Sequence, residues 1–368
     1  MLRFRMNRPP RTRFPSPLSL PQGLSWSLLS ALLWLGLASC DFGTGVRQAQ
    51  FIVFGTQVDV SVRGVGEDQA SEAFAQLQQD FLAMHRDWHA WEPGLLHDIN
   101  EAFASGLPAR ADPAIVEMVK ASQALEALSG GRFNPAIGAL IELWGFHTSD
   151  YPVYGPPPSP LAIDALVAQR PSTRDIQVDG LLLSSGNTAV QLDFGGIAKG
   201  YAIDLACQRL RAFGVENAIV NAGGDLRAIG DHGDRPWRVA IRDPRGGIVG
   251  SLETRGDEAV FTSGNYERFR EDEQLRYPHI LDPRTGWPVV ELSSVTVIAD
   301  DGLLADAAAT ALIVAGPAEW AEVARTMDLA EVLVVDAKGR VFQTPAMAER
   351  VALVDGVESE TVNVSVAP

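Results

Sequence analysis

The fold depends on a glycine-rich stretch in the middle of the chain, LDFGGIAKGYA, which occupies residues 192–202. The glycines at positions 195, 196 and 200 carry no Cβ, so the backbone can closely approach a ligand or a neighbouring segment. Apolar spacing beyond them predicts a helix over residues 198–213. Backbone amides at the start of such a helix suit a diphosphate group. We therefore expect a tight turn into a helix with an anion site, and a plain helix start is the alternative interpretation.

Predicted strands and helices on either side of this stretch alternate without regular spacing. Residues 51–63 alternate as a strand, residues 74–88 carry apolar side chains at helical spacing, and Asp112 with Pro113 marks the start of a second helix. Further strands are predicted near residues 218–221, 237–241, 260–263, 294–299 and 330–335, and further helices from residue 303 and near residues 317–327. Because no βαβ unit repeats, we expect a compact α+β fold with mixed sheets and packed helices.

The first residues have the composition of an export signal. Residues 1–40 contain five arginines and no acid, and an apolar run over residues 24–37 is followed by Ala38, Ser39 and Cys40. This run is too short to span a bilayer comfortably. The order Leu-Ala-Ser-Cys resembles a bacterial lipobox, which implies that Cys40 is acylated after cleavage. An ordinary signal peptide, or a first helix that is retained, is the alternative interpretation.

Charge and cysteine content limit the classes of partner. Without the signal peptide the chain keeps 25 basic and 46 acidic residues, a formal charge of −21. A nucleic-acid interface needs the opposite sign, so DNA and RNA partners are not expected. Cys207 is the one cysteine left after Cys40, so we expect no disulfide within one mature chain.

Two familiar patterns do not fit the chain. Neither GxGxxG nor GxxxxGK[ST] can be laid on the glycine pairs at residues 195–196 and 223–224. His85 and His89 are four residues apart, but the glutamate of an HExxH zinc motif is missing. We interpret this pair as helix surface or core rather than as a zinc site.

Four separated segments form a larger pattern. They are GGRFNP with LWGF (residues 130–135 and 143–146), LDFGGIAKGYA (192–202), TSGNY running to HILDPRTG (262–266 and 279–286), and ADAAATA (305–311). In this order they resemble the ApbE family of FAD:protein FMN transferases across nearly the whole mature chain. The resemblance implies Mg2+-dependent transfer of FMN from FAD to a threonine of another protein, with release of AMP.

The resemblance also defines an organisation along the chain. We expect a lipoprotein signal peptide over residues 1–39, a tether over 40–50, a flavin transferase catalytic domain over 51–354 and a loose tail over 355–368.

The last of the four segments carries the predicted metal ligands. Cleavage of FAD between its phosphates is phosphoryl transfer, for which a hard divalent cation with oxygen ligands is the usual aid. Asp306 and Thr310 are four residues apart on a predicted helix, so their oxygens point the same way. The resemblance implies that both bind Mg2+ together with the backbone carbonyl of Gly196, and it assigns Asp306 to catalysis. Some members carry a second acid where this chain has Ala309, which predicts weaker metal binding here. A solvated helix residue is the alternative interpretation of Asp306.

The resemblance also places a set of side chains around FAD. They are Phe54, Trp91, Arg132, Phe133, Asn134, Asp193, Lys199 and Leu281. Asp193 matches a position that contacts the nucleotide, and Lys199 matches one where a charged residue faces FAD. Trp91 aligns with an aromatic position that stacks on the isoalloxazine ring. A core position is the alternative interpretation of Trp91.

His279 is the histidine inside a matched motif. It is suited to act as a general base or as a donor to the diphosphate, since its ordinary pKa lies near the working pH. A histidine that caps the turn before Asp282 is the alternative interpretation. Because the acceptor threonine comes from another chain, the sequence does not identify the base.

Three functions fit these residues. The first is the transferase, and the second is a metal-dependent FAD pyrophosphatase that gives free FMN and AMP. Relatives inclined to hydrolysis carry a polar residue at the position of Trp91, which favours transfer. The third is a non-catalytic FAD-binding lipoprotein, against which the pair of Asp306 and Thr310 argues.

The resemblance extends to partners and location. It implies acceptor subunits of membrane redox complexes, such as sodium-translocating NADH:quinone reductase and Rnf-type complexes. The lipobox implies a lipid anchor at the periplasmic face of the bacterial inner membrane. Asp41 supports this location, because an aspartate after the acylated cysteine retains lipoproteins there in enteric-type sorting.

Overall fold

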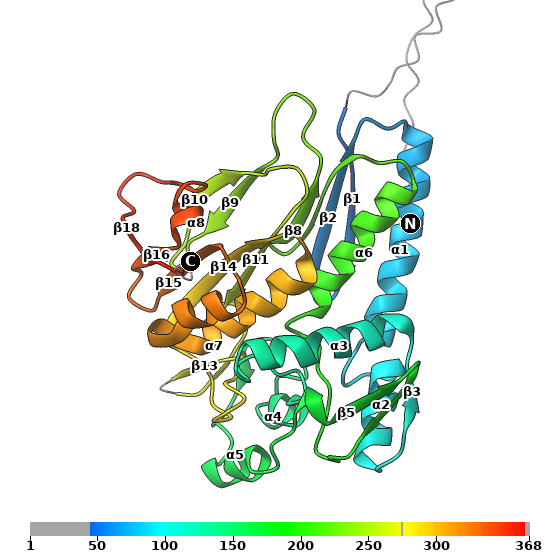
Figure 1. Ribbon diagram of the computed structural model, residues 1–368, viewed down its shortest axis with the longest axis vertical. Coiled ribbons are helices and arrows are strands. Elements are labelled where there is room, and N and C mark those ends of the chain that lie inside the picture. Colours follow the sequence, from blue (N-terminus) through cyan, green and yellow to red (C-terminus); the bar gives the residue numbers. More distant parts are fainter. Residues whose placement is uncertain (1–44, 274, 365–368) are drawn as a thin grey trace, which may run out of the picture. The chain divides into compact units, whose positions relative to one another are not determined.

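A nine-stranded sheet forms the centre of the protein, and its strands lie side by side in the order in which they occur in the chain (Figure 1). They are β1 (Arg47–Val53), β2 (Thr56–Arg63), β7 (Asn217–Ala222), β8 (Asp225–Ile229), β11 (Glu258–Gly264), β14 (Leu292–Ala299), β15 (Glu331–Asp336), β16 (Val341–Gln343) and β18 (Ser359–Thr361). Neighbours pair antiparallel except β16 and β18, which are parallel. The computed structural model describes residues 45–273 and 275–364. The predicted signal peptide, Cys40 and Asp41 lie outside these residues.

The central strands bury both faces, because successive side chains of a strand point to opposite sides of a sheet. On β11, Ala259 and Phe261 belong to one apolar core and Val260 to another. On β15, Val334 and Leu333 divide in the same way. The strands therefore separate two cores, which explains why they read as nearly continuous runs of apolar residues.

Three helices cover the face of the first core (Figure 1). Helix α1 (Glu67–Asp87) packs on β1, α6 (Ala198–Ala212) on β7 and β8, and α7 (Gly302–Thr326) on β11 and β14. The second core lies under a three-stranded sheet of β9 (Arg238–Arg242), β10 (Ile248–Glu253) and β17 (Ala352–Leu353), with α8 (Pro345–Ala348) beside it. These mixed sheets and packed helices confirm the predicted α+β class.

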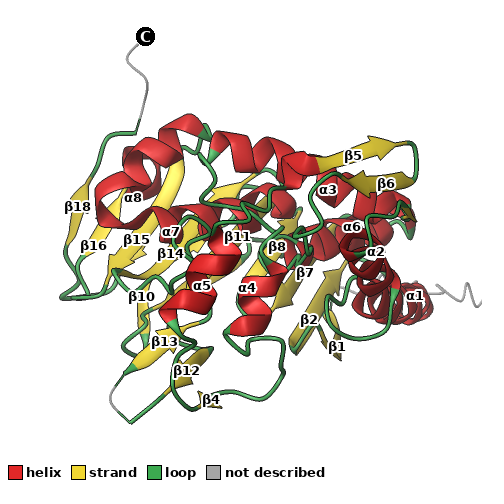
Figure 2. Cartoon of the chain, turned by 90° about the horizontal axis from the view of Figure 1, so that it is seen from below, coloured by secondary structure: helices red, strands yellow, loops and turns green. Residues whose placement is uncertain are grey.

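The remaining elements form smaller groups. Helices α4 (Gly138–Leu143) and α5 (Pro160–Val167) lie next to each other (Figure 2) and contribute to a third apolar cluster around Trp144. Other elements are α2 (Leu95–Ala104), α3 (Pro113–Leu128), a 3-10 turn η1 (Thr173–Asp175), a sheet of β3 (Ala109–Arg110), β5 (Ile176–Asp179) and β6 (Leu182–Ser185), and a sheet of β4 (Val153–Tyr154), β12 (Phe269–Glu271) and β13 (Arg276–Pro278). Helix α3 begins as predicted, with Oδ1 of Asp112 accepting a hydrogen bond of 2.7 Å from the N–H of Ile115.

The N-terminal end of the predicted domain differs from the expected structure. The strand expected over residues 51–63 is a hairpin, in which Phe54 and Gly55 form the turn with φ values of 56° and 67°. Because a phenylalanine rarely adopts positive φ, the sequence carries no common hairpin signal there. Part of the expected tether already belongs to β1, which begins at Arg47.

The expected loose tail is instead ordered over much of its length. Residues 359–361 form β18, which pairs with β16, and Val364 is buried in the first core. The tail is polar because β18 lies exposed at the edge of the sheet, where polar side chains are appropriate.

Helix α7 carries the predicted metal ligands and is broken at Gly316, which has a φ of 71°. Pro317 follows the break, in agreement with the two helices expected there. By length and composition α7 could cross a membrane, but 67% of its most apolar window is buried inside the fold. In this fold α7 is a core helix that packs on β11 and β14.

Candidate active site

A cavity of about 260 Å³ brings together residues from all four sequence segments. It lies where the β7–β8 turn and the end of β11 meet the start of α6 and the first half of α7. Its walls include Trp91, Arg132, Phe133, Asn134, Asp193, Gly196, Lys199, His279, Leu281, Asp306 and Thr310. All predicted site residues within the described part of the chain, except Phe54, therefore lie around one cavity.

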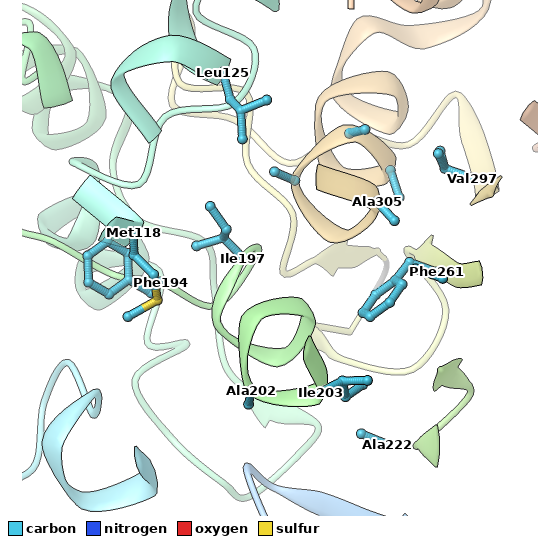
Figure 3. Close-up of a cluster of buried hydrophobic side chains, with 14 of the residues drawn as sticks. Met118, Leu125, Phe194, Ile197, Ala202, Ile203, Ala222, Phe261, Val297 and Ala305 are labelled. Carbon is cyan, nitrogen blue, oxygen red and sulfur yellow. The ribbon is translucent and has the colours of Figure 1, made fainter. Parts of the chain in front are cut away.

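Helices α6 and α7 touch beside this cavity. A Cβ on Gly200 would lie 2.0 Å from the carbonyl oxygen of Gly302, so a side chain at either crossing point would force the helices apart. The backbone N–H of Gly200 donates a hydrogen bond of 2.9 Å to Oδ2 of Asp306. Figure 3 shows the apolar packing around the two helices, including Ile203 of α6 and Ala305 of α7. The glycine-rich stretch thus holds the predicted metal ligand.

A buried acid fixes the start of α7. The carboxylate of Asp204 accepts hydrogen bonds from the N–H groups of Gly302 (2.8 Å) and Leu303 (2.9 Å), and from Nη1 of Arg227 (2.5 Å). Burial raises the pKa of Asp204, although these three donors oppose the change. Sequence reasoning missed Asp204 and Arg227, because no motif links residues that meet only in the folded chain.

The predicted metal ligands present a set of oxygen atoms. Oγ1 of Thr310 lies 3.1 Å from Oγ of Ser263, and a Cβ on Gly196 would lie 3.0 Å from the same Thr310 atom. Asp306, Thr310 and the backbone of Gly196 therefore border one space. Across residues 45–273 and 275–364, no group of three or more His, Cys, Asp or Glu side chains is placed to hold a metal ion, so the predicted ligands at this space are one carboxylate, one hydroxyl and one backbone carbonyl. The oxygen set fits a hard cation such as Mg2+.

Asp306 is the carboxylate of α7 that borders this space. Ala309, where some relatives carry a second acid, is completely buried in the first core. A carboxylate there would have to be accommodated among apolar side chains.

Burial and neighbouring charges set the ionisation of Asp306. Lys199 forms an ion pair with Asp225 at the start of β8, and the other carboxylate oxygen of Asp225 accepts a hydrogen bond of 2.8 Å from the N–H of Thr262. Burial opposes the charge of Lys199, but Asp225 and Asp306 outweigh it and raise the pKa of the lysine. Burial raises the pKa of Asp306 to about 7, although Lys199 opposes this. A divalent cation beside Asp306 would favour the ionised carboxylate and so oppose the effect of burial.

Two polar residues expected at FAD already have protein partners. Arg132 donates to Oε2 of Glu319 (2.7 Å) and to the carbonyl oxygen of Ser129 (2.9 Å). Its Nε is buried and has no hydrogen-bond partner among the residues that the structure describes. The Asn134 amide bonds only to backbone groups of Pro171 and Ala136. Asn134 therefore holds the loop that forms the cavity wall.

The apolar residues expected at FAD divide into two groups. Phe133 and Leu281 are 3% and 5% exposed and border the cavity, so they form a rigid wall. Phe54 lies outside the cavity lining. Its ring contacts Phe81 and His85, with centroid distances of 5.8 Å and 6.0 Å. The hairpin turn places Phe54 against α1, whereas the resemblance implied a position at FAD.

His279 is held as a neutral imidazole. Its Nδ1 lies 3.2 Å from the carbonyl oxygen of Arg268, which can only accept, so Nδ1 carries the proton and Nε2 is the free acceptor. Burial, together with the positive charges of Arg268 and Lys199, lowers the pKa of His279 to about 4. At neutral pH the ring is therefore unprotonated, and Nε2 can accept a hydrogen bond.

Sequence reasoning missed several residues of the wall, of which Arg268 matters most for charge. Its guanidinium lies 5.8 Å from the ring centre of Tyr151, and it has no ion pair with a carboxylate among the residues described. Its charge is therefore available to an anionic ligand. Arg268 lies between two matched motifs, so only its place beside Tyr151 and His279 reveals it. Asp225, Thr262 and Ser263 also line the cavity.

Comparisons with known proteins identify relatives of this chain. The model of the ApbE family matches residues 54–334. A Rhodobacter capsulatus protein named FAD:protein FMN transferase is 45% identical over 311 residues, which is 83% of this chain and 58% of that protein. The chain thus spans less than two thirds of that relative. A Treponema pallidum protein of the same name is 32% identical, over 87% of this chain and 93% of that protein. The crystal structure of the ApbE protein from Thermotoga maritima superposes with a TM-score of 0.75 at 30% identity, over 83% of this chain and 99% of that one.

Proposed function

Because the chain belongs to the ApbE family, we propose that it transfers FMN from FAD to a threonine of an acceptor protein, with release of AMP and with Mg2+ as its metal. One observation carries this proposal: residues from four separated segments line a single cavity, with Asp306 and Thr310 beside the glycine-rich turn. The names of the relatives support the transfer of FMN from FAD to a protein. The proposal goes beyond these names in specifying a threonine acceptor, Mg2+ and the release of AMP.

The proposed step exchanges one bond to phosphorus for another. The threonine oxygen attacks the phosphorus of the FMN half, the anhydride bond to AMP breaks, and the hydroxyl proton passes to a base. Nε2 of His279 suits this base, because the ring is neutral and its Nδ1 is held by a carbonyl group. Lys199 and Arg268 are the cavity cations that can offset phosphate charge. A Mg2+ ion held by Asp306, Thr310 and Gly196 would supply further charge neutralisation and orientation.

Competition with water decides between transfer and hydrolysis. Water is present at about 55 M and needs no docking, so a transferase must exclude it from the diphosphate. Trp91 borders the cavity and keeps 37% of its surface exposed, so it is available to cover a flavin ring. This position favours transfer over the simple cleavage of FAD.

We propose that the enzyme is anchored by a lipid on Cys40 at the periplasmic face of the inner membrane. Support comes from the order of residues 37–40 and from Asp41. Acceptor subunits of membrane redox complexes would then lie within reach. Fractionation of cells that express the wild type and Cys40→Ser tests the anchor: the wild type should sediment with membranes and the variant should not. Soluble, unlipidated wild type would contradict it.

Incubation of the mature protein with FAD, Mg2+ and a candidate redox subunit tests the activity. We expect AMP in solution and a mass gain of one FMN unit on the subunit, both lost with EDTA and restored by Mg2+. A threonine-to-alanine change in the subunit should prevent the mass gain. Free FMN with AMP and no mass gain would indicate a pyrophosphatase, and bound FAD without AMP would indicate a binding protein.

A further inference from the structure

Trp91 lies in a segment that has no helix or strand to hold it. It belongs to the connection between α1 and α2, which runs from Trp88 to Gly94 as bends and turns. An exposed tryptophan in such a connection would sample several rotamers, and a ligand that needs one of them would have to restrict the others. A contact with another part of the chain would restrict these rotamers.

That contact is made by His147, which follows α4 in the chain. The two rings are stacked, with centroids 4.7 Å apart and planes within 15° of each other. The His147 side chain is 8% exposed, whereas Trp91 is 37% exposed, so the histidine lies behind the indole. His89 also contacts Trp91, at 4.2 Å but with planes 66° apart, so it meets the indole at a steep angle and does not share its plane.

A second bond fixes His147 itself. Its Nε2 lies 3.2 Å from Oδ2 of Asp193, and Oδ1 of Asp193 accepts a hydrogen bond of 2.8 Å from the N–H of Gly195. The backbone N–H of Asp193 also donates to the carbonyl oxygen of Pro135 (2.8 Å). Asp193 is thus anchored on both sides, and His147 connects it to Trp91.

The position of His147 relative to the cavity is distinctive. Trp91 and Asp193 both line the cavity, but His147, which touches both, does not. A residue in this place would act on a ligand through its neighbours.

We propose that His147 is a positioning residue that fixes the plane of Trp91 against the glycine-rich turn, so that the flavin meets a preformed aromatic surface. The inference rests on the proposed function, since it assumes that FAD enters this cavity. Preformed orientation increases affinity because less side-chain entropy is lost on binding. An aromatic stack contributes enough for its loss to weaken FAD binding by about three- to tenfold.

The first experiment observes Trp91 without any ligand. The protein is labelled with 5-fluorotryptophan, and the 19F resonance of Trp91 is assigned with Trp91→Phe. In His147→Ala this resonance should shift and broaden, while His147→Phe, which keeps a stacking ring, should leave it narrow. Thermal unfolding of each variant separates a local effect from loss of the fold. A Trp91 resonance that is unchanged in His147→Ala would overturn the proposal.

The second experiment measures FAD affinity by quenching of flavin fluorescence in EDTA, which prevents turnover. His147→Ala should raise the Kd for FAD by about three- to tenfold, and His147→Phe should restore most of the affinity. Equal or tighter binding by His147→Ala would overturn the proposal, because the histidine would then be neutral or would block the ring. If the wild type does not bind FAD, the proposed function fails, and the 19F measurement still decides whether His147 orients Trp91.

His232 offers a matched control. It contacts Trp237 with centroids 5.0 Å apart, and neither residue lines the cavity. His232→Ala should therefore shift the resonance of Trp237, leave that of Trp91 in place and keep the Kd for FAD within about twofold of the wild type.

Discussion

The backbone N–H of Gly200 and the carboxylate of Asp306 are joined by a hydrogen bond of 2.9 Å, which links the first turn of α6 to α7. The bond uses Oδ2 of Asp306, and a carboxylate oxygen has more than one acceptor site. Asp306 can therefore keep this bond while it binds a cation. The same glycine that allows the two helices to touch also orients the charged group between them.

Asp306→Asn should abolish AMP formation and leave FAD binding nearly intact. The amide keeps the size of the side chain and an acceptor for Gly200, but it removes the negative charge that a divalent cation needs. We expect AMP release to fall by at least about a hundredfold, measured by chromatography with saturating Mg2+. Glu322→Gln, on the exposed side of α7, is the control. Wild-type turnover in Asp306→Asn would contradict the metal assignment.

Gly200→Ala should destabilise the protein and disturb the metal site together. The added Cβ would meet the carbonyl oxygen of Gly302 at 2.0 Å, so the helices must separate. We expect a loss of about 1–3 kcal/mol in the free energy of unfolding, measured in urea. Gly186→Ala is the control, because nothing lies within 4 Å of a Cβ there, and it should change stability by less than about 0.5 kcal/mol. Equal stability of the two variants would show that α6 and α7 tolerate the separation.

Arg268→Ala should weaken FAD binding by about tenfold or more, because a charge-assisted contact to the diphosphate is lost. Arg268→Lys should recover part of the affinity. The control is Arg276→Ala on β13, since Arg276 is exposed and already paired with Glu271 at 2.8 Å. Titration with FAD in EDTA gives the Kd of each variant. Unchanged affinity in Arg268→Ala would place the diphosphate elsewhere.

His279 should make stability depend on pH. Its pKa is lowered from 6.5 to about 4 in the folded protein, so the unfolded chain binds a proton first as the pH falls. The free energy of unfolding should therefore decrease between about pH 6.5 and pH 4, by at most about 3 kcal/mol, and the contribution should be complete above pH 6.5.

His279→Gln isolates this effect. The raised pKa of Asp306 has the opposite sign, because the folded protein then binds its proton first, but it is present in both proteins and cancels in the comparison. Urea unfolding in EDTA from pH 4.5 to 7.5 should give a flatter profile for His279→Gln than for the wild type. Parallel profiles would mean that His279 titrates normally in the folded state.

Trp91→Asn should raise the ratio of free FMN to protein-bound FMN. The change loosens the part of the cavity where the flavin ring is proposed to stack, and it leaves the ligands of the proposed metal in place. Water should therefore compete more effectively with the acceptor threonine. The measurement compares both products in one reaction with an acceptor subunit. Tyr154→Asn is the control, since Tyr154 is 74% exposed and lies outside the cavity lining. An equal fall of both products would identify Trp91 as a structural residue.

Periodic signals in the sequence predicted much of the fold. Apolar spacing predicted a helix over residues 198–213, and α6 covers Ala198–Ala212. The strands predicted near residues 260–263 and 294–299 match β11 and β14 within a few residues. The hairpin at Phe54 was missed because its turn uses a bulky residue at positive φ. Strand β18 was missed because a short polar edge strand has no apolar pattern.

Local spacing in the sequence also predicted part of the site, whereas contacts between distant segments were not predicted. The spacing of Asp306 and Thr310 predicted that their oxygens share one side of a helix, and the structure brings both to the cavity. Asp204, Arg268 and His147 could not be predicted, because each acts through residues far away in the sequence. His147, for example, bonds to a residue 46 positions away.

The strand order of the central sheet has a consequence for how the protein assembles. From β1 to β16 every strand pairs with the strand of this sheet that precedes it in the chain, and each pairing is antiparallel. No later strand has to insert between two that are already joined. The sheet can therefore grow from one side while the chain emerges from the ribosome, and each new strand up to β16 finds its partner already in place. Strand β18, which follows all the other strands in the chain, is therefore the last to join the described sheet.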